Sequence, residues 1–311
     1  MKTFTLPGTD IVAPNVILGL MRIQDKTDDE VRELVRTARD AGTTFVDHAA
    51  VYGDEKHGCE TRFAEALDLT PSQRDEFVIQ TKAGIIKDGP YFDFSYDEII
   101  GSVEGSLRAL RTDHVDILLL HRPDALVEPD EVARAFDELA AAGKVRAFGV
   151  SNHTPRQIEL LKKSVTQPLV VNQVQLSITH APLVAAGVSA NMAALDQSID
   201  RDGGLLDYCR LHDITLQAWS PFQKGFFDGV FLGDRENFAE LNDVIDRLAA
   251  TYGVTPIGIA TAWITRHPAQ MQVVLGTTTP SRVTEAAAGS DLPLTRAEWY
   301  ELFRAAGHTV P

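Results

Sequence analysis

Eight short apolar runs, spread along the whole chain, constrain the fold more than any other feature of this sequence. Each run is nearly continuous in apolar residues instead of alternating with polar ones, which is typical of parallel strands that are covered on both faces. Amphipathic patterns typical of helices separate the runs. The eight runs are Val16–Leu20, Thr44–Ala49, Phe77–Lys82, Val115–His121, Val145–Asn152, Leu169–Leu176, Thr215–Ser220 and Met271–Thr277.

The segments between these runs carry the start and stop signals of helices. Thr27 to Glu30 has the spacing of a capping box, in which two side chains satisfy free amide groups at a helix start. Thr279 precedes Pro280, and a capping hydroxyl followed by proline favours the first turn of a helix. Eight strands, mostly each followed by a helix, predict an α/β fold, a (β/α)8 TIM barrel that forms a single domain over residues 1–311.

The alternative architecture is an open, doubly wound sheet, which should carry a glycine-rich fingerprint after an early strand. No G-x-G-x-x-G or G-x-x-x-x-G-K-[ST] motif occurs in the chain. Thr3–Leu6 and Ile11–Val12, joined by Pro7-Gly8, predict a short hairpin that closes the N-terminal end of the barrel. Long loops inside compact domains are usually functional. We therefore expect the substrate pocket to be walled by Ala83–Phe94, by Ser177–Gly203 and by the C-terminal segment after Ser290.

Composition limits the partners of this chain. Lys plus Arg is 29 and Asp plus Glu is 44, so the formal net charge is −15, which does not suit nucleic-acid phosphate or an anionic membrane. The N-terminus has no apolar segment of the signal-peptide type, and no stretch approaches 18 consecutive apolar residues. Cys59 and Cys209 form no C-x-x-C pair. We expect a cytoplasmic protein that acts on a small molecule, and we leave the oligomeric state open.

In such a barrel the active site lies at the C-terminal ends of the strands. The second run reaches Asp47, with Tyr52 five residues later, while the third ends at Lys82 and the fourth at His121. A lysine that ends a buried strand needs a carboxylate partner, and Asp47 is available. The ammonium group should lower the pKa of Tyr52 because it favours the phenolate. Tyr52 would then act as a general acid on an oxygen that His121 orients.

Other polar residues end the remaining strands. The fifth run delivers Ser151 and Asn152, and the sixth carries Gln173. A buried amide such as that of Gln173 needs partners, and an interior that faces a ligand supplies them. Ser151 and Asn152 have an alternative role as caps of the helix that follows them. Trp219, at the end of the seventh run, has an alternative role in the core.

Taken in order, these motifs resemble the aldo-keto reductase superfamily, and a bacterial branch of it in particular. The match spans Gly19 to Arg282, and the ordered set is far more specific than any one motif. The resemblance implies a (β/α)8 reductase that uses NADPH without a Rossmann fold. The motifs that carry it are Val46–Gly53, Thr81–Lys82, Leu118–Pro123, Gly143–Asn152, Asn172–Gln173 and Trp219–Pro221.

The resemblance also implies catalytic roles. Asp47, Tyr52, Lys82 and His121 match the catalytic tetrad of the family. Tyr52 would be the general acid, Lys82 would lower its pKa, Asp47 would hold Lys82, and His121 would orient the carbonyl group. Family members with glutamate at the position of His121 reduce steroid carbon–carbon double bonds, so the histidine implies reduction of aldehydes or ketones.

Cofactor contacts follow partly from the resemblance and partly from physical chemistry. Ser151, Asn152 and Gln173 match the residues that bind the nicotinamide carboxamide, and Trp219 matches an aromatic ring against the nicotinamide face. The loops after the last two strands, with a helix N-terminus, form the usual phosphate site of such barrels. Arg282 in that helix suits the 2′-phosphate of NADP. Further candidate cofactor contacts are Gly19, Met21, Arg22, Ser220, Pro221, Thr277 and Thr278.

Two other functions stay open. A barrel of this kind could be an NADP-binding sensor or regulatory subunit with little turnover, which should expose an apolar partner surface. Asp47 and His48 could instead be ligands of a metal-dependent hydrolase. Successive strand residues point to opposite sides, however, and the chain has no H-x-H or H-E-x-x-H spacing. We therefore expect no metal site.

Overall fold

Eight parallel strands close into a barrel in the computed structural model, which describes residues 1–226 and 228–311. The strands follow one another around the barrel in chain order, and the last pairs with the first. All eight strands predicted from the apolar runs are present, which confirms the (β/α)8 fold. They are β3 (Val16–Gly19), β4 (Phe45–Asp47), β5 (Val78–Ala83), β8 (Val115–Leu120), β9 (Val145–Ser151), β10 (Leu169–Gln175), β11 (Thr215–Trp219) and β12 (Gln272–Leu275).

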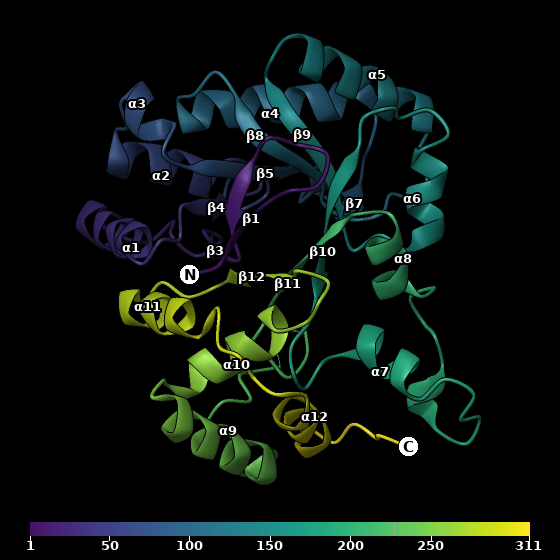
Figure 1. The fold of residues 1–311 in the computed structure, drawn as a ribbon. Helices are drawn as coiled ribbons and strands as arrows, with labels where there is room; N and C mark the ends of the chain where they lie inside the picture. The colour runs from purple at the N-terminus through teal and green to yellow at the C-terminus, as the bar shows by residue number, and fades with distance from the viewer. Residues whose placement is uncertain (227) are drawn as a thin grey trace.

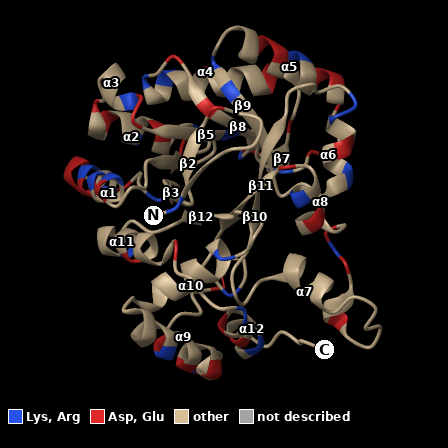
Figure 2. Cartoon of the chain, viewed as in Figure 1, with Lys and Arg blue, Asp and Glu red and all other residues tan. Residues whose placement is uncertain are grey.

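Helices surround the strands (Figure 1), and most Lys, Arg, Asp and Glu residues lie on this outer layer (Figure 2). Thr27 and Glu30 form the predicted capping box at the start of α1. The helices are α1 (Asp28–Asp40), α2 (Gly58–Leu67), α3 (Pro71–Arg74), α4 (Tyr96–Leu110), α5 (Pro129–Ala141), α6 (Pro155–Leu161), α7 (Pro182–Val188), α8 (Leu205–Leu211), α9 (Ala239–Tyr252), α10 (Pro256–Thr265), α11 (Pro280–Gly289) and α12 (Arg296–Ala305), with a 3₁₀ turn η1 (Asp196–Ser198). In the part of the chain that the structure describes, no helix is both long and apolar enough to cross a membrane.

One cap differs from its prediction. The Thr279 side chain makes no capping hydrogen bond to α11. The backbone N–H group of Thr279 instead donates to Oγ1 of Thr277 at 3.1 Å, which fixes the turn before the helix. The first amide groups of α11 therefore stay free of a side-chain cap.

Side chains alternate along each strand between the barrel interior and the helix layer. Phe45 and Ile117 point inward and pack in one apolar cluster, whereas Val46 and Leu118 point outward into another. The predicted N-terminal hairpin is present as β1 (Thr3–Thr5) and β2 (Val12–Pro14). Leu6 of this hairpin joins the inward cluster. The hairpin thus closes the N-terminal end of the barrel, and the opposite end holds the polar interior.

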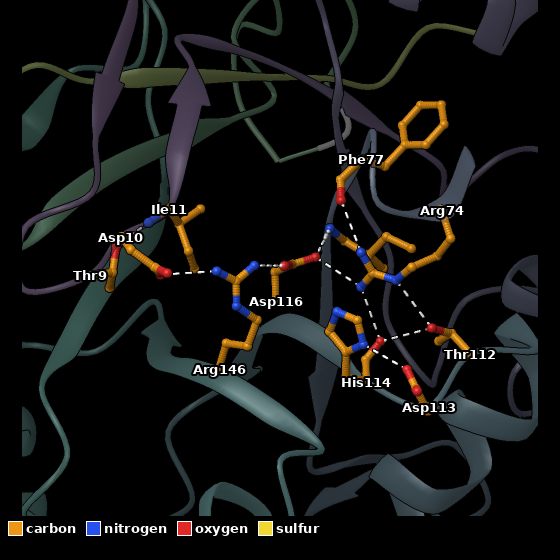
Figure 3. A network of polar contacts seen from close by, with 11 residues as sticks. Thr9, Asp10, Ile11, Arg74, Phe77, Thr112, Asp113, His114, Asp116 and Arg146 are labelled. Atoms are coloured by element: carbon orange, nitrogen blue, oxygen red, sulfur yellow. Dashed lines mark hydrogen bonds and ion pairs between the residues drawn. The ribbon is translucent and has the colours of Figure 1, made fainter. Parts of the chain in front are cut away.

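A buried carboxylate holds the N-terminal end of the barrel together (Figure 3). Asp116, at the start of β8, accepts hydrogen bonds from Arg74 at 2.9 Å, from Arg146 at 2.6 Å and from the amide of Ile79 at 2.8 Å. Arg146 also pairs with Asp10 between the two hairpin strands at 2.9 Å. The Asp116 carboxylate and the Arg74 guanidinium group can stay charged at this depth only with such a complete set of partners. The network lies at the N-terminal end of the barrel, where residues are expected to stabilise the fold and not to take part in catalysis.

The two long segments that were expected to be loops, residues 83–94 and 177–203, contain regular secondary structure. Residues 83–94 include a small hairpin of β6 (Ile85–Ile86) and β7 (Tyr91–Phe92), and residues 177–203 include α7 and η1. Gln197 of the second segment donates to the backbone oxygen of Thr309, and His308 contacts the backbone oxygen of Ile178. The second segment and the C-terminus therefore pack against each other.

Candidate active site

Four side chains, two from strands and two from the segments just after strands, meet at the C-terminal end of the barrel. The ammonium group of Lys82 lies 2.6 Å from Oδ2 of Asp47, 2.8 Å from the backbone oxygen of His48 and 3.1 Å from the hydroxyl of Tyr52. Lys82 is only 1% exposed. All three donors of the ammonium group therefore have partners, as burial of a charge requires.

The local backbone explains this meeting. Asp47 and Lys82 are inward positions on the neighbouring strands β4 and β5, so both point into the barrel. Tyr52 follows β4 in a turn in which its N–H group donates to the backbone oxygen of Ala49. The ring of His121, just after β8, lies edge-on to the ring of Tyr52 at 5.7 Å. The four residues predicted from separate strand ends thus share one site.

Burial and charge set the protonation of this group. Burial by itself would lower the pKa of Lys82, but the Asp47 carboxylate and the Tyr52 hydroxyl hold that pKa above its ordinary value. Burial raises the pKa of Tyr52, and the Lys82 ammonium group opposes that rise without cancelling it. The expected net lowering for Tyr52 is therefore wrong, because a phenolate loses more solvation here than one ammonium group returns. Burial, Lys82 and Arg122 keep the pKa of His121 well below 6.5, so its ring is neutral at pH 7.

A network of glutamine side chains lies beneath Asp47. Oδ1 of Asp47 accepts from Gln80 at 2.5 Å and from Gln173 at 3.1 Å. Both amides also donate to Oε1 of Gln217, at 2.9 and 3.0 Å. Gln217 in turn donates to Gln272 at 3.0 Å. Each of these residues occupies an inward position, so the polar contacts extend across the barrel from Asp47 to β12.

Sequence reasoning found Gln173 but missed Gln80 and Gln217. Both stand in apolar strands, as Gln173 does, so the same argument from a buried amide would have identified them. Gln80 donates to Asp47 as Gln173 does, and Gln217 accepts from both of these amides and holds them in place. These contacts on Oδ1 orient the Asp47 carboxylate so that its Oδ2 faces the Lys82 ammonium group.

Ser151, Asn152 and Trp219 form a second polar group on the adjoining side of the barrel. Ser151 donates its hydroxyl to the backbone oxygen of Gln173 at 2.9 Å, and Asn152 donates to the Ser151 hydroxyl at 2.8 Å. The indole N–H of Trp219 donates to Oδ1 of Asn152 at 3.0 Å. The helix α6 has its own capping box at Thr154. Neither Ser151 nor Asn152 is therefore needed as its cap, and Trp219 is tied to Asn152 instead of lying in the apolar core.

Asn152 and Ser220 adopt an uncommon backbone conformation. Their φ angles are 60° and 52°, in the left-handed region that costs energy for residues other than glycine. Both residues line the same cavity. Strained residues cluster at functional sites because the surrounding structure must hold them in place.

One cavity of about 1020 Å³ joins these groups. Nearly all of the candidate residues line it, while Lys82 lies behind Asp47 and Tyr52, and Thr278 is not part of the lining. The cavity is larger than a site for a small carbonyl compound needs, which fits a dinucleotide and a substrate together. The predicted residues in the lining are Gly19, Met21, Arg22, Asp47, Tyr52, His121, Ser151, Asn152, Gln173, Trp219, Ser220, Pro221, Thr277 and Arg282.

The expected walls are only partly right. Ile85 and Phe92 of the first long segment line the cavity, but its lining includes no described residue from 177–203 or from the chain after Ser290. Those two segments contact each other instead, as described above. Residues 220–238, between β11 and α9, supply Phe222, Phe226, Val230 and Leu232. Sequence reasoning missed this segment, although its length alone marks it as a candidate functional loop.

The far end of the cavity has the donors that phosphate groups need. Arg282 lies in the first turn of α11, and Arg22 donates to the backbone oxygen of Gly276 at 3.4 Å. The N-terminus of α11 lies at the same end, where the helix dipole favours an anion. Amide and hydroxyl groups near Tyr52 and cations near α11 thus match the two ends of a nicotinamide dinucleotide.

His48 lies on the other side of its strand from Asp47. It is fully buried, and its ring packs edge-on against Phe63 at 5.0 Å. Among residues 1–226 and 228–311, no group of three His, Cys, Asp or Glu side chains could hold a metal ion. The Asp47-His48 pair is therefore divided between the barrel interior and the helix layer.

Known proteins are similar to this chain over nearly its whole length. The sequence pattern of the Aldo/keto reductase family matches residues 15–305. Oxidoreductase YdhF of Escherichia coli K12 is 36% identical over 95% of this chain and 94% of its own length. The 6-dehydroglucose reductase of Agrobacterium fabrum C58 is 33% identical over 93% of this chain and 92% of its own length. The solved structure of a glycerol dehydrogenase from Gluconobacter oxydans shares the fold, with a TM-score of 0.78 at 24% identity over 99% of this chain and 96% of that one.

Proposed function

Because this chain belongs to the aldo/keto reductase family and is an oxidoreductase that acts on carbonyl groups with a nicotinamide cofactor, we propose that it reduces aldehydes or ketones with NADPH and that Tyr52 supplies the proton. One observation carries the proposal. At the inner end of the cavity, the buried ammonium group of Lys82 contacts both the Asp47 carboxylate and the Tyr52 hydroxyl, at 2.6 and 3.1 Å.

NADPH, when bound, supplies a hydride to the carbonyl carbon. Tyr52 donates its phenolic proton to the carbonyl oxygen, and the bond between that oxygen and the proton forms as negative charge develops on the oxygen. The neutral ring of His121 lies beside Tyr52 and orients the same oxygen by hydrogen bonding. Neither step requires a metal ion.

Lys82 stabilises the phenolate that Tyr52 becomes when it loses its proton. The ammonium group already contacts the hydroxyl in the resting site, so no rearrangement is needed when the charge develops. Asp47 balances the buried lysine, and Gln80 and Gln173 hold Asp47 in turn. The protein thus keeps a fixed positive charge next to the acid at pH 7.

The other candidate residues hold the cofactor. Asn152 and Gln173 would bind the carboxamide, because both amides line the cavity near Tyr52. The Trp219 ring, held by Asn152, would cover the nicotinamide face. Arg282 would bind the 2′-phosphate at the α11 end, since a guanidinium group pairs well with phosphate. This last contact is the basis for proposing NADPH over NADH.

The first test measures the binding of NADPH and of NADH through the quenching of tryptophan fluorescence. The second measures NADPH oxidation in the presence of aldehydes and ketones. Tyr52→Phe removes one hydroxyl and keeps the ring. We expect this variant to bind NADPH and to lose at least about 10²-fold in kcat. Wild-type turnover in Tyr52→Phe would refute its role as the acid. NADPH binding without turnover of any carbonyl compound would favour the sensor or regulatory role instead.

A further inference from the structure

The guanidinium group of Arg122 is half-buried in the wall of the cavity, directly after His121. With the described residues it forms no hydrogen bond or ion pair. Its one recorded ring contact is with Trp219, whose centroid lies 5.6 Å from the guanidinium carbon. The five N–H donors of this side chain therefore have no acceptor among the described residues, and the side chain lines the cavity.

An unpaired guanidinium group is unexpected in this chain. Acidic residues outnumber basic ones by 44 to 29, and the other buried or half-buried guanidinium groups of Arg62 and Arg74 each pair with a carboxylate. Burial lowers the pKa of Arg122 without a carboxylate to oppose the shift. A partly desolvated charge costs free energy unless a partner compensates it. The cavity that Arg122 lines gives such a partner room to bind.

The cofactor accounts for the other arginines of the cavity but not for Arg122. Arg22 and Arg282 lie near α11, at the end proposed for the phosphates. Arg122 lies instead beside His121 and interacts electrostatically with Tyr52, at the end where the carbonyl group reacts. Of the two carboxylates in the lining, Asp47 is neutralised by Lys82, and Glu285 belongs to α11.

We propose that Arg122 binds an anionic group of the substrate, a carboxylate or a phosphate, and that the enzyme therefore prefers carbonyl compounds that carry such a group. This inference rests on the proposed function. The planar guanidinium group can pair with two oxygens of either anion at once. Lys87, whose ammonium group donates to the backbone oxygen of Gly53, adds a second positive charge at the rim. Val51, Ile85 and Phe92 supply apolar surface for the rest of the substrate.

The experiment compares substrates that are matched in shape and differ in charge. One pair is 4-carboxybenzaldehyde and the uncharged 4-carbamoylbenzaldehyde, and the other is glyceraldehyde 3-phosphate and glyceraldehyde. We expect wild-type kcat/KM to favour the charged member of at least one pair, and the favoured pair identifies the anion. Arg122→Gln should lower this charged-to-neutral ratio by roughly 10- to 100-fold, the equivalent of one charge-assisted hydrogen bond. The loss should appear mainly in KM for the charged substrate.

Two controls separate the site from net charge and from misfolding. Arg108→Gln removes the same charge from an exposed position near the C-terminal end of α4, and the ratio should not change. Arg122→Lys keeps the charge without the planar group, so we expect an intermediate ratio. In the wild type, added salt should reduce the preference for the charged substrate.

Each outcome decides a separate point. Equal wild-type kcat/KM for both members of both pairs, or an unchanged ratio in Arg122→Gln, would refute the assignment of Arg122 while leaving carbonyl reduction intact. Weaker NADPH binding in Arg122→Gln with an unchanged ratio would place Arg122 in the cofactor site and also refute it. If the enzyme turns over none of the four compounds and none of a wider set of aldehydes and ketones, the proposed function itself is refuted.

Discussion

Replacing Asp47 with asparagine should disable the site while preserving its shape. Asp47→Asn removes the negative charge that lies 2.6 Å from the Lys82 ammonium group. The pair is nearly inaccessible to water, with Lys82 1% and Asp47 2% exposed. The substitution leaves Lys82 buried without its counter-ion, and it also changes the acceptor that Gln80 and Gln173 share.

The magnitude follows from this geometry. At 2.6 Å and an effective dielectric constant of about 20, Coulomb's law gives roughly 6 kcal/mol for the pair. Removal of one partner from buried pairs typically costs about 3–5 kcal/mol. An unfolding entropy of about 2.1 cal/mol/K per residue then predicts, for 311 residues, a fall of roughly 5–8 °C in Tm. Loss of assisted proton transfer from Tyr52 should reduce kcat by about 10²- to 10⁴-fold.

Asp116→Asn is the matched control. Asp116 is also 2% exposed and is paired with Arg74 and Arg146 (Figure 3), but it lies near the start of its strand, at the opposite end of the barrel. It should lose stability in the same range, toward the lower end because Arg146 is 40% exposed and keeps Asp10 as a partner. Its kcat should stay at the wild-type value. The assays are thermal unfolding followed by circular dichroism and steady-state NADPH oxidation at 25 °C.

Two results would contradict this reasoning. Wild-type kcat in Asp47→Asn would show that Lys82 does not need its carboxylate to assist Tyr52. An equal loss of kcat in Asp116→Asn would show that turnover follows overall stability and not the charge beside Tyr52.

Three further predictions concern stability and cofactor choice. Burial lowers the pKa of His48, His153 and His267 to about 4 and that of His121 well below 6.5. The unfolded chain therefore binds more protons below pH 6.5, so stability should fall as the pH drops from about 6.5 toward 4, by up to about 1.4 kcal/mol per histidine and pH unit; a Tm that stays constant from pH 7 to pH 5 would contradict this. Gln217→Leu deprives the Gln80 and Gln173 amides of their shared acceptor and should cost about 1–3 kcal/mol in urea unfolding, whereas a gain in stability would show that the network is dispensable. Arg282→Ala should weaken NADPH binding by roughly 10- to 100-fold and NADH binding far less, and an equal loss for both cofactors, measured by tryptophan quenching, would exclude a 2′-phosphate contact.

Much of the fold could be predicted because it depends on local patterns. A parallel strand covered on both faces must be apolar throughout, so each barrel strand is visible as a run of apolar residues. Lys82 was recognisable for the opposite reason, because a charge at the end of such a run is expensive unless it has a function or a partner. The order of the motifs then connected the four tetrad residues before any contact was known.

Other features could not be predicted from one position at a time. The net pKa of Tyr52 depends on how far burial outweighs the Lys82 ammonium group, and both effects depend on tertiary packing. The sequence predicts a cavity wall from residues 83–94, 177–203 and the segment after Ser290, yet only the first of these lines the cavity, together with residues of the 220–238 segment. Residues 177–203 and 220–238 both follow barrel strands, and only the packing of residues 177–203 against the C-terminus separates their roles.

The sequence by itself determined the barrel, the strand ends and the residue types at those ends, since side-chain alternation and burial of apolar runs are local consequences of the chain. Only the tertiary structure decided which polar groups have partners. It closed the contacts of Asp47 through Gln80 and Gln173 and left Arg122 without an acceptor among residues 1–226 and 228–311. Hydrogen bonds and ion pairs act over a few ångströms between residues far apart in sequence, so their presence or absence is established when the barrel closes.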